Sequence, residues 1–120
     1  MRKTVLLLAV LCLSLSAFAD AVIPTGPLTL VDPQTVCMIN EQAMGKDQIP
    51  VEVDGKIYYG CCEMCKKALA ENASKRAAID PVSGKKVDKA TAVIAAQQDG
   101  RVFYFENAAN LAKHNAQYKK

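Results

Sequence analysis

The chain has 120 residues, of which 51% are hydrophobic, and it carries a formal charge of +3 at pH 7. Two of the basic residues stand at positions 2 and 3, and the rest of the chain carries +1, too close to neutral for the strongly basic surface that nucleic-acid-binding proteins present. The sequence contains no tryptophan and five cysteines, so its chemistry is expected to lie with the thiols.

Residues 1–19 have the three parts of a secretory signal peptide. Arg2 and Lys3 form a positive start, residues 5–15 form an apolar core, and the sequence AFA at 17–19 supplies small residues where a signal peptidase cuts. The apolar core is shorter than the roughly 20 residues of a membrane span. We therefore predict a periplasmic or secreted protein that begins near Asp20, carries a charge of +1 after loss of Arg2 and Lys3, and keeps no membrane span. A mature chain this short favours two small units, each needing a staple, over one sizeable core.

Residues 20–36 contain three prolines and a glycine without a helical period, which predicts an extended arm or linker. The first unit, residues 37–74, follows. Its sequence predicts a strand at Ile49–Val53, a hairpin turn at Asp54-Gly55, and a return strand at Lys56–Gly60. A helix is predicted from about Cys62 to residues 71–73, because good helix formers follow that point.

The same pattern returns in a second unit, residues 79–118, after a charged connector at Lys75–Lys89. Strands are predicted at Thr91–Gln97 and Arg101–Phe105, with a turn at residues 99–100, and a helix is predicted at Asn107–His114. The sequences VDGKIYYGCCEMCKKAL (53–69) and QDGRVFYFENAANLAKH (98–114) align without a gap at an offset of 45 residues. The shared turn, strand and helix signals favour an internal duplication. The fold class predicted is α+β, with two tandem β-hairpin-plus-helix units.

The two units differ in their cysteines. In this alignment Cys61 lies opposite Glu106 and Cys65 lies opposite Asn110, and upstream Cys37 lies opposite Ser83 at an offset of 46. The second unit is therefore predicted to keep the fold without a thiolate site.

Cys37, Cys61 and Cys65 are the candidate ligands of a metal ion, since thiolates bind Zn(II) and Cu(I) well. Cys61 is expected where a strand ends and Cys65 in the first helical turn, where the helix dipole should lower the thiol pKa. Neighbouring cysteines rarely bind one ion together, so Cys62 is a reserve ligand. Met38 is a further candidate through its thioether, as is Met64.

Two other interpretations of the thiols stay open. In an oxidising compartment an even number of cysteines is typical of disulfides, which would make the chain a stapled interaction or structural module without metal. Cys62-x-x-Cys65 also resembles the motif of thiol redox enzymes, although that motif normally lies in a βαβ scaffold. The sequence lacks paired carboxylates, a Ser-His-Asp set and a phosphate loop, so we expect no enzyme. The single histidine, His114, aligns with Leu69 and is expected to be a packed helix residue.

The first unit, in which one cysteine precedes the sequence YYGCCEMC, resembles the TRASH domain, a short cysteine-containing metal-associated module. The second unit resembles the related YHS domain. Its sequence DPVSGKKV (80–87) is similar to the DPVCGMxV opening of that family, and FYFENAANLAKHNAQY (103–118) is similar to the family's ending. Ser83, Lys85 and Glu106 stand where YHS members often have Cys, Met and Cys. The resemblance implies a β-hairpin-plus-helix fold of the zinc-ribbon or treble-clef type and a role in heavy-metal sensing, trafficking or resistance. The expected partners are a heavy-metal ion, with Zn(II) or Cu(I) favoured by the thiol ligands, and a metal-transport or resistance protein.

Overall fold

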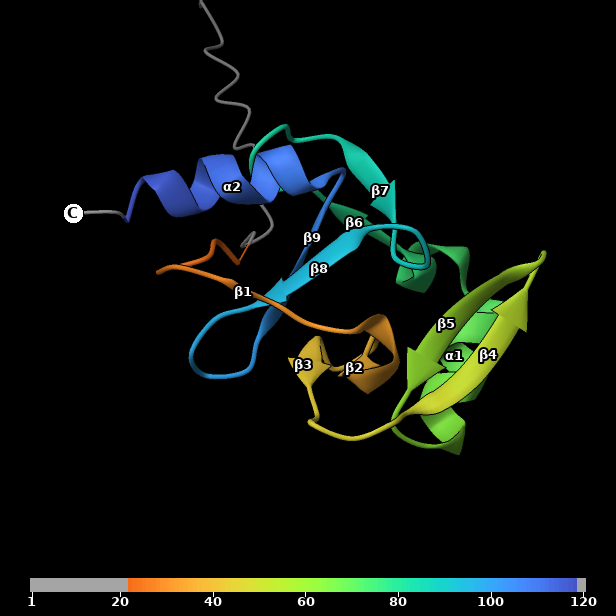
Figure 1. Ribbon diagram of the computed structural model, residues 1–120. Helices are drawn as coiled ribbons and strands as arrows, with labels where there is room; N and C mark the ends of the chain where they lie inside the picture. The colour runs from red at the N-terminus through yellow and green to blue at the C-terminus, as the bar shows by residue number, and fades with distance from the viewer. Residues whose placement is uncertain (1–21, 119–120) are drawn as a thin grey trace, which may run out of the picture.

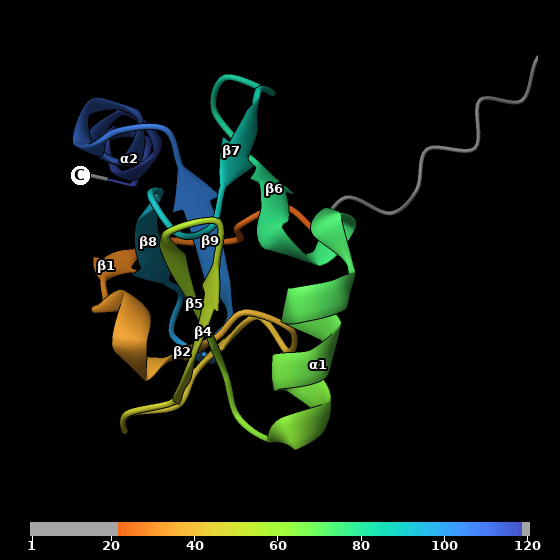
Figure 2. The same cartoon turned by 90° about the vertical axis from the view of Figure 1, so that its right-hand side faces the viewer.

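The computed structural model describes residues 22–118, so the predicted signal peptide at residues 1–19 lies outside the described part. The described chain is an α+β fold of small antiparallel sheets with two α-helices (Figure 1). The two helices lie at opposite ends of the molecule, α1 beside strands β4 and β5 and α2 beyond β8 and β9 (Figures 1 and 2). Within residues 22–118 neither helix has the length and apolar character needed to cross a membrane.

The first predicted hairpin and helix are confirmed. Strand β4 (Ile49–Val53) pairs antiparallel with β5 (Lys56–Gly60), and α1 spans Glu63–Glu71. The turn residues Asp54 and Gly55 have φ angles of 52° and 77°, as the tight hairpin turn with two left-handed residues requires. Cys62 caps the N-terminus of α1 in an extended conformation.

The second hairpin and helix are confirmed as well. Strand β8 (Val93–Ala96) pairs with β9 (Val102–Phe105), and α2 spans Ala108–Ala116. Helix α2 starts 45 residues after α1, the offset that the sequence alignment predicts. Asn107 takes the capping position that Cys62 has in α1, and its side chain accepts a hydrogen bond from the backbone of Asn110.

Part of the predicted extended arm before Cys37 pairs with residues of the second unit, residues 79–118. Strand β1 (Thr29–Leu30) pairs antiparallel with β8 and forms the edge of a three-stranded sheet ordered β1-β8-β9. Asn115 of α2 accepts a hydrogen bond from the backbone N–H of Leu28 and donates one to its carbonyl. The prolines exclude a helix, but an extended backbone can still serve as an edge strand.

Two further hairpins escaped the sequence analysis. After the short 3-10 helix η1 (Pro33–Thr35), strands β2 (Val36–Cys37) and β3 (Gln42–Ala43) enclose the turn that follows Cys37. The segment at Lys75–Lys89, predicted to be a charged connector, has regular structure instead. It follows the start of the 3-10 helix η2 (Ala73–Arg76) and contains a hairpin of β6 (Ala77–Ile79) and β7 (Lys86–Asp88). Strands of two or three residues are too short to show a period of two, so only their pairing reveals them.

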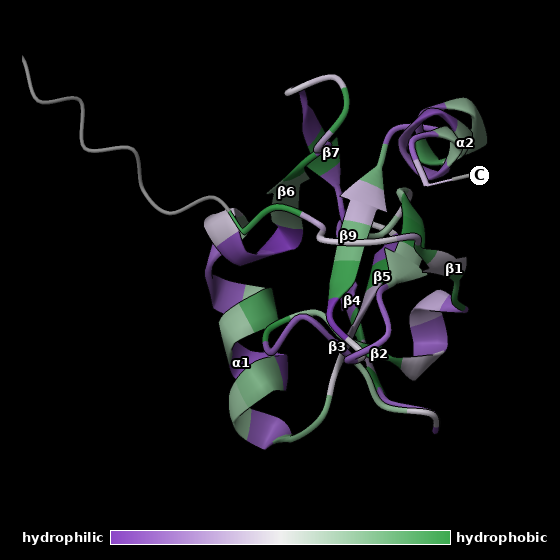
Figure 3. Cartoon of the chain, turned by 90° about the vertical axis from the view of Figure 1, so that its left-hand side faces the viewer, coloured by the Kyte–Doolittle hydropathy of each residue, from purple (hydrophilic) through white to green (hydrophobic). Residues whose placement is uncertain are grey.

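The sequence favours two small units over one sizeable core, and the structure shows that these two units share their larger core. The larger cluster of buried side chains joins Val51, Tyr58 and Leu69 of the first half to Ile94 and Tyr104 of the second. Helix α1 contributes one apolar face to it, and Figure 3 shows hydrophilic and hydrophobic bands alternating along that helix. A small chain buries more apolar surface when its halves share a core, which explains why the two halves pack together.

Candidate metal centre

The structure brings the three predicted cysteines together from three separate elements. Cys37 ends β2, Cys61 follows β5, and Cys65 is the third residue of α1. Their sulfur atoms all lie within 4.8 Å of one another, with Cys61 Sγ and Cys37 Sγ at 3.6 and 3.9 Å from Cys65 Sγ. Cys37 and Cys65 are buried and Cys61 is half-buried.

These separations fit a single thiophilic ion. Two sulfurs bound to one tetrahedral Zn(II) at about 2.3 Å lie about 3.8 Å apart, and a trigonal arrangement at the same bond length separates them by about 4.0 Å. The two separations from Cys65 Sγ, 3.6 and 3.9 Å, lie close to both values. The three thiols could therefore bind one ion with little movement of the backbone.

Gly60 lets the strand approach the helix closely enough for this arrangement. A Cβ atom added at Gly60 would lie 2.9 Å from the Cβ of Cys65 and 3.2 Å from its backbone carbon. Neither atom belongs to the flexible end of a side chain, so a larger residue would force β5 and α1 apart. The corresponding residue of the second half is Phe105, which is fully buried.

Asn40 connects two of the cysteines and was missed by the sequence analysis. Its backbone N–H donates to Cys37 Sγ at 3.4 Å, and its side-chain amide donates to Cys61 Sγ at 3.3 Å. Hydrogen bonds to sulfur stabilise the thiolate form, which is the form that binds metal. An Asn three residues after a cysteine was the available signal, but its contact with Cys61 depends on the tertiary structure.

The other predicted metal ligands, Cys62, Met38 and Met64, differ from the three thiols in their surroundings. Cys62 is exposed, and its Sγ lies 3.5 Å from Cys65 Sγ, but it does not belong to the group of three thiols that are mutually close. Met38 is fully buried within the larger core cluster, and Met64 is 82% exposed at the start of α1.

The pKa values of the thiols differ from the expectation. Desolvation by burial, together with hydrogen bonds between the Cys65 thiol and the sulfurs of Cys62 and Cys61, raises the pKa of Cys65 to about 12. A hydrogen bond with Cys37 raises the pKa of Cys61. The predicted lowering is thus wrong for both residues, because neighbouring sulfurs, and burial for Cys65, raise their pKa values.

The remaining two thiols have lowered pKa values. Burial opposes ionisation of Cys37, but the backbone N–H groups of Asn40 and Ile39 hold its pKa below the ordinary value. At the helix cap, hydrogen bonds from the backbone and thiol of Cys65 lower the pKa of Cys62. Of the four thiols, the buried Cys37 and the exposed Cys62 are therefore the two that ionise more readily than an ordinary cysteine.

The hydrogen bonds of two turns show which residue of the second half corresponds to Cys37. The backbone N–H of Glu41 donates to the carbonyl of Cys37 at 2.9 Å, and that of Gly84 donates to the carbonyl of Asp80 at 2.8 Å. Both donors have positive φ angles, 57° at Glu41 and 73° at Gly84. The counterpart of Cys37 is therefore Asp80, and the predicted match with Ser83 is wrong by three residues.

The Asp80 carboxylate connects the segments that the cysteines bring together in the first half. One oxygen accepts the backbone N–H groups of Val82 and Ser83 at 2.7 and 3.1 Å. The other accepts the N–H of Glu106 at 2.8 Å and the side-chain amide of Asn110 at 2.9 Å, and these residues correspond to Cys61 and Cys65. A buried hydrogen-bonded carboxylate thus stands at the place in the second half that the thiol cluster has in the first.

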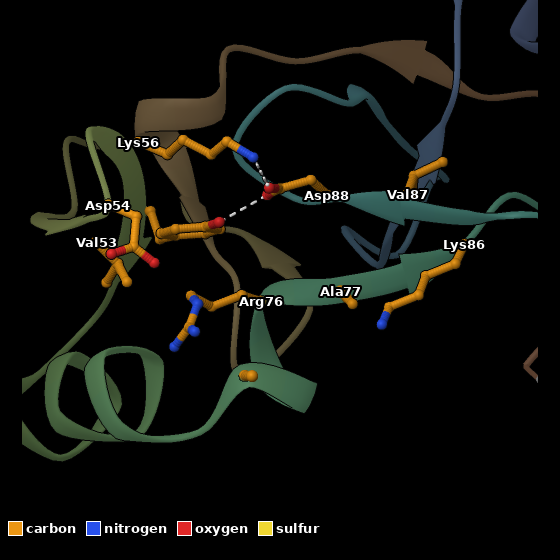
Figure 4. Close-up of a pocket in the computed structure, with 10 residues that line it drawn as sticks. Val53, Asp54, Lys56, Arg76, Ala77, Lys86, Val87 and Asp88 are labelled. Atoms are coloured by element: carbon orange, nitrogen blue, oxygen red, sulfur yellow. Dashed lines mark hydrogen bonds and ion pairs between the residues drawn. The ribbon is translucent and has the colours of Figure 1, made fainter.

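A cavity of about 400 Å³ lies between the first hairpin and the β6–β7 hairpin (Figure 4). Three of its charged side chains, those of Lys56, Arg76 and Asp88, already have partners within the described chain. Lys56 pairs with Asp88 at 2.7 Å, the Tyr58 hydroxyl donates to the same carboxylate at 2.8 Å, and Arg76 donates to the carbonyl of Leu69. We assign this cavity to the contact between the halves.

His114 is buried, and its Nε2 lies 2.9 Å from the carbonyl oxygen of Gly26, so its expected role as a packed helix residue is confirmed.

Within residues 22–118 the cysteine cluster is therefore the group whose donors match those of a thiophilic-metal site. Comparison with protein-family models, with curated proteins and with solved structures found no match to this chain.

Proposed function

We propose that this is an exported protein that binds a heavy-metal ion, Zn(II) or Cu(I), as cargo through Cys37, Cys61 and Cys65. The observation that supports it is the placement of three sulfurs within 4.8 Å of one another, two of them buried. Three protein ligands leave a coordination position free for water, for the exposed Cys62, or for a thiol of an acceptor protein. An ion held in this way can be released, so buffering or delivery of the ion fits better than a purely structural role.

The sequence resemblance to TRASH and YHS domains supports the same proposal. In this view the chain is a tandem of two treble-clef-like units, of which the first binds the ion and the second has replaced its thiols by the Asp80 network. Acting in metal trafficking or resistance, the protein would exchange its ion with a transport or resistance protein. No reaction of its own is assigned to it.

Native mass spectrometry of the mature protein, purified from the periplasm before and after treatment with a chelator, tests the proposal. We expect one metal adduct per chain that leaves with the chelator and is absent in Cys65→Ser. Reduced protein that forms no stoichiometric adduct with added Zn(II) or Cu(I) would overturn the proposal.

Disulfide bonding is the alternative that the same measurement distinguishes. Cys65 Sγ lies 3.5 to 3.9 Å from the three other thiols, so a modest movement could join it to any one of them. A mature protein that is four hydrogens lighter than the reduced chain and carries no metal would indicate two disulfides. The chain would then be a stapled interaction module.

A further inference from the structure

Lys89, which follows β7 in the second half, is buried to an extent that is unusual for a lysine. It is 4% exposed, and a buried ammonium group is costly unless it is paired. Its Nζ donates to the carbonyl of Met38 at 2.8 Å and forms an ion pair with the Glu41 carboxylate. The same nitrogen lies 5.2 Å from the centre of the Tyr104 ring. Both oxygen partners of Lys89 therefore belong to the turn that follows Cys37.

That turn carries a glutamate at position 41, where the backbone conformation favours glycine. Glu41 has a φ angle of 57°, a conformation that side chains with a Cβ rarely adopt, and the corresponding residue of the second half is Gly84. Glycine would therefore suit the backbone better at position 41. The glutamate side chain contributes the ion pair with Lys89, which glycine could not form.

The backbone of Glu41 is also tied to the second half. Its N–H closes the turn onto the carbonyl of Cys37, and its carbonyl accepts the N–H of Val102 in β9 at 3.0 Å. Cys61 and Cys65, in contrast, lie on one continuous hairpin and helix, so their separation is set within the first half. The backbone N–H of Met38 also donates to the carbonyl of Tyr59 in β5 at 2.9 Å, so the Cys37 turn is held by both halves. Of the three ligands, Cys37 is thus the one whose turn the second half helps to position.

We propose that Lys89 is a positioning residue for the candidate metal centre and that the second half acts as a metal-free template that holds Cys37 in place. This inference rests on the proposed function. The template needs no ion of its own, because the Asp80 carboxylate already connects its turn, its strand end and its helix. Without Lys89, the ion would have to order the Cys37 turn as it binds, and that cost would appear as weaker binding.

Lys89→Met, which keeps an unbranched side chain but removes the charge, tests the proposal in the full mature chain. Lys56→Met is the matched control, because the Lys56–Asp88 ion pair also joins the two halves but does not contact the Cys37 turn. We expect Lys89→Met to bind Zn(II) about tenfold more weakly in competition with a chelator, equivalent to about 1.4 kcal/mol. Lys56→Met should bind as the wild type does.

A second measurement is independent of metal. In reduced, metal-free protein the alkylation of each cysteine is followed by mass spectrometry under conditions in which the chain stays folded. Lys89→Met should expose Cys37, fully buried in the wild type, and raise its alkylation rate relative to that of Cys65. A lysine that only stabilised the fold as a whole would lower the melting temperature and leave this ratio unchanged.

Unchanged Zn(II) affinity and an unchanged alkylation ratio in Lys89→Met, or equal changes in Lys56→Met, would overturn the inference. If the wild type bound no metal, the proposed function would fail, while the alkylation ratio would still report whether Lys89 positions Cys37. If Lys89→Met did not fold, Glu41→Gln would decide, since the Glu41 side chain is 26% exposed and its replacement removes the same ion pair. Glu41→Gln should change both readouts in the same direction, and no change in either would overturn the inference.

Discussion

Replacement of Asp80 by asparagine tests whether its carboxylate holds together the turn, the strand end and the helix of the second half. The thiol cluster with its ion is proposed to hold together the same three segments of the first half. The side chain is fully buried, and its two oxygens together accept four hydrogen bonds. An asparagine of nearly the same shape has one oxygen, so its amide nitrogen would face two of the four donors. Each buried donor left without an acceptor costs about 1–3 kcal/mol, so Asp80→Asn should lower the free energy of unfolding by about 2–6 kcal/mol.

A loss of this size is a large share of the roughly 5–15 kcal/mol that stabilises a typical domain. For a domain of about 100 residues it corresponds to a fall in melting temperature of about 10 °C or more. The assay is thermal and urea unfolding of the reduced mature chain in the presence of a chelator. Asp99→Asn is the control, because Asp99 also accepts two hydrogen bonds but lies in an exposed turn, and its replacement should leave the melting temperature nearly unchanged.

The pH dependence gives a second readout for the same variant. Burial opposes ionisation of Asp80, but hydrogen bonds from Asn110 and from backbone N–H groups hold its pKa below the ordinary value of 3.8. A lowered pKa in the folded state stabilises the protein above pH 3.8, and that stabilisation is lost as the pH falls through the folded pKa. The difference between wild type and Asp80→Asn should therefore shrink below about pH 4. A variant that unfolds within about 1 kcal/mol of the wild type at pH 7 would refute the reasoning.

Three further predictions concern the thiols and the arm. Cys65→Ser should abolish stoichiometric metal binding in native mass spectrometry, whereas Cys62→Ser should keep one ion per chain; loss of the ion from both variants would make Cys62 a required ligand. Because the pKa values of Cys61 and Cys65 are raised, both thiols must lose a proton when they bind the ion, so the affinity should rise with pH by up to about tenfold per pH unit for each proton released. Calorimetry in buffers of different ionisation enthalpy counts these protons, and an affinity that is constant from about pH 6 to 8 would contradict the assignment. Asn115→Ala removes both hydrogen bonds to the Leu28 backbone and should destabilise the protein by about 1–3 kcal/mol in urea unfolding, with faster proteolysis of the arm; unaltered proteolysis would show that β1 is held by other contacts.

Features that depend on a few neighbouring residues could be predicted from the sequence. The turn at Asp54-Gly55, the two hairpins and helices, and the 45-residue offset between them follow from local backbone preferences. The positions of Cys61 at a strand end and of Cys65 in the first helical turn are local in the same sense. Their spacing was sufficient to nominate them, together with Cys37, as a ligand set.

The tertiary structure alone decided the features that depend on residues far apart in the sequence. It paired the arm with β8 and joined the halves through one core, which no local period indicates. It also raised the pKa of Cys65, because the fold buries this thiol among other sulfurs, which the sequence does not reveal.

The correspondence of Asp80 with Cys37 could not be read from the aligned letters, since it rests on matching turn hydrogen bonds and positive φ angles. Lys89 gave no signal either, because a lysine in a charged segment is ordinarily solvated. Its importance appears only once the chain places it, 51 residues from Met38, against the turn that carries Cys37. Local preferences determined which elements form and which residues could bind an ion, and long-range packing decided what holds those residues in place.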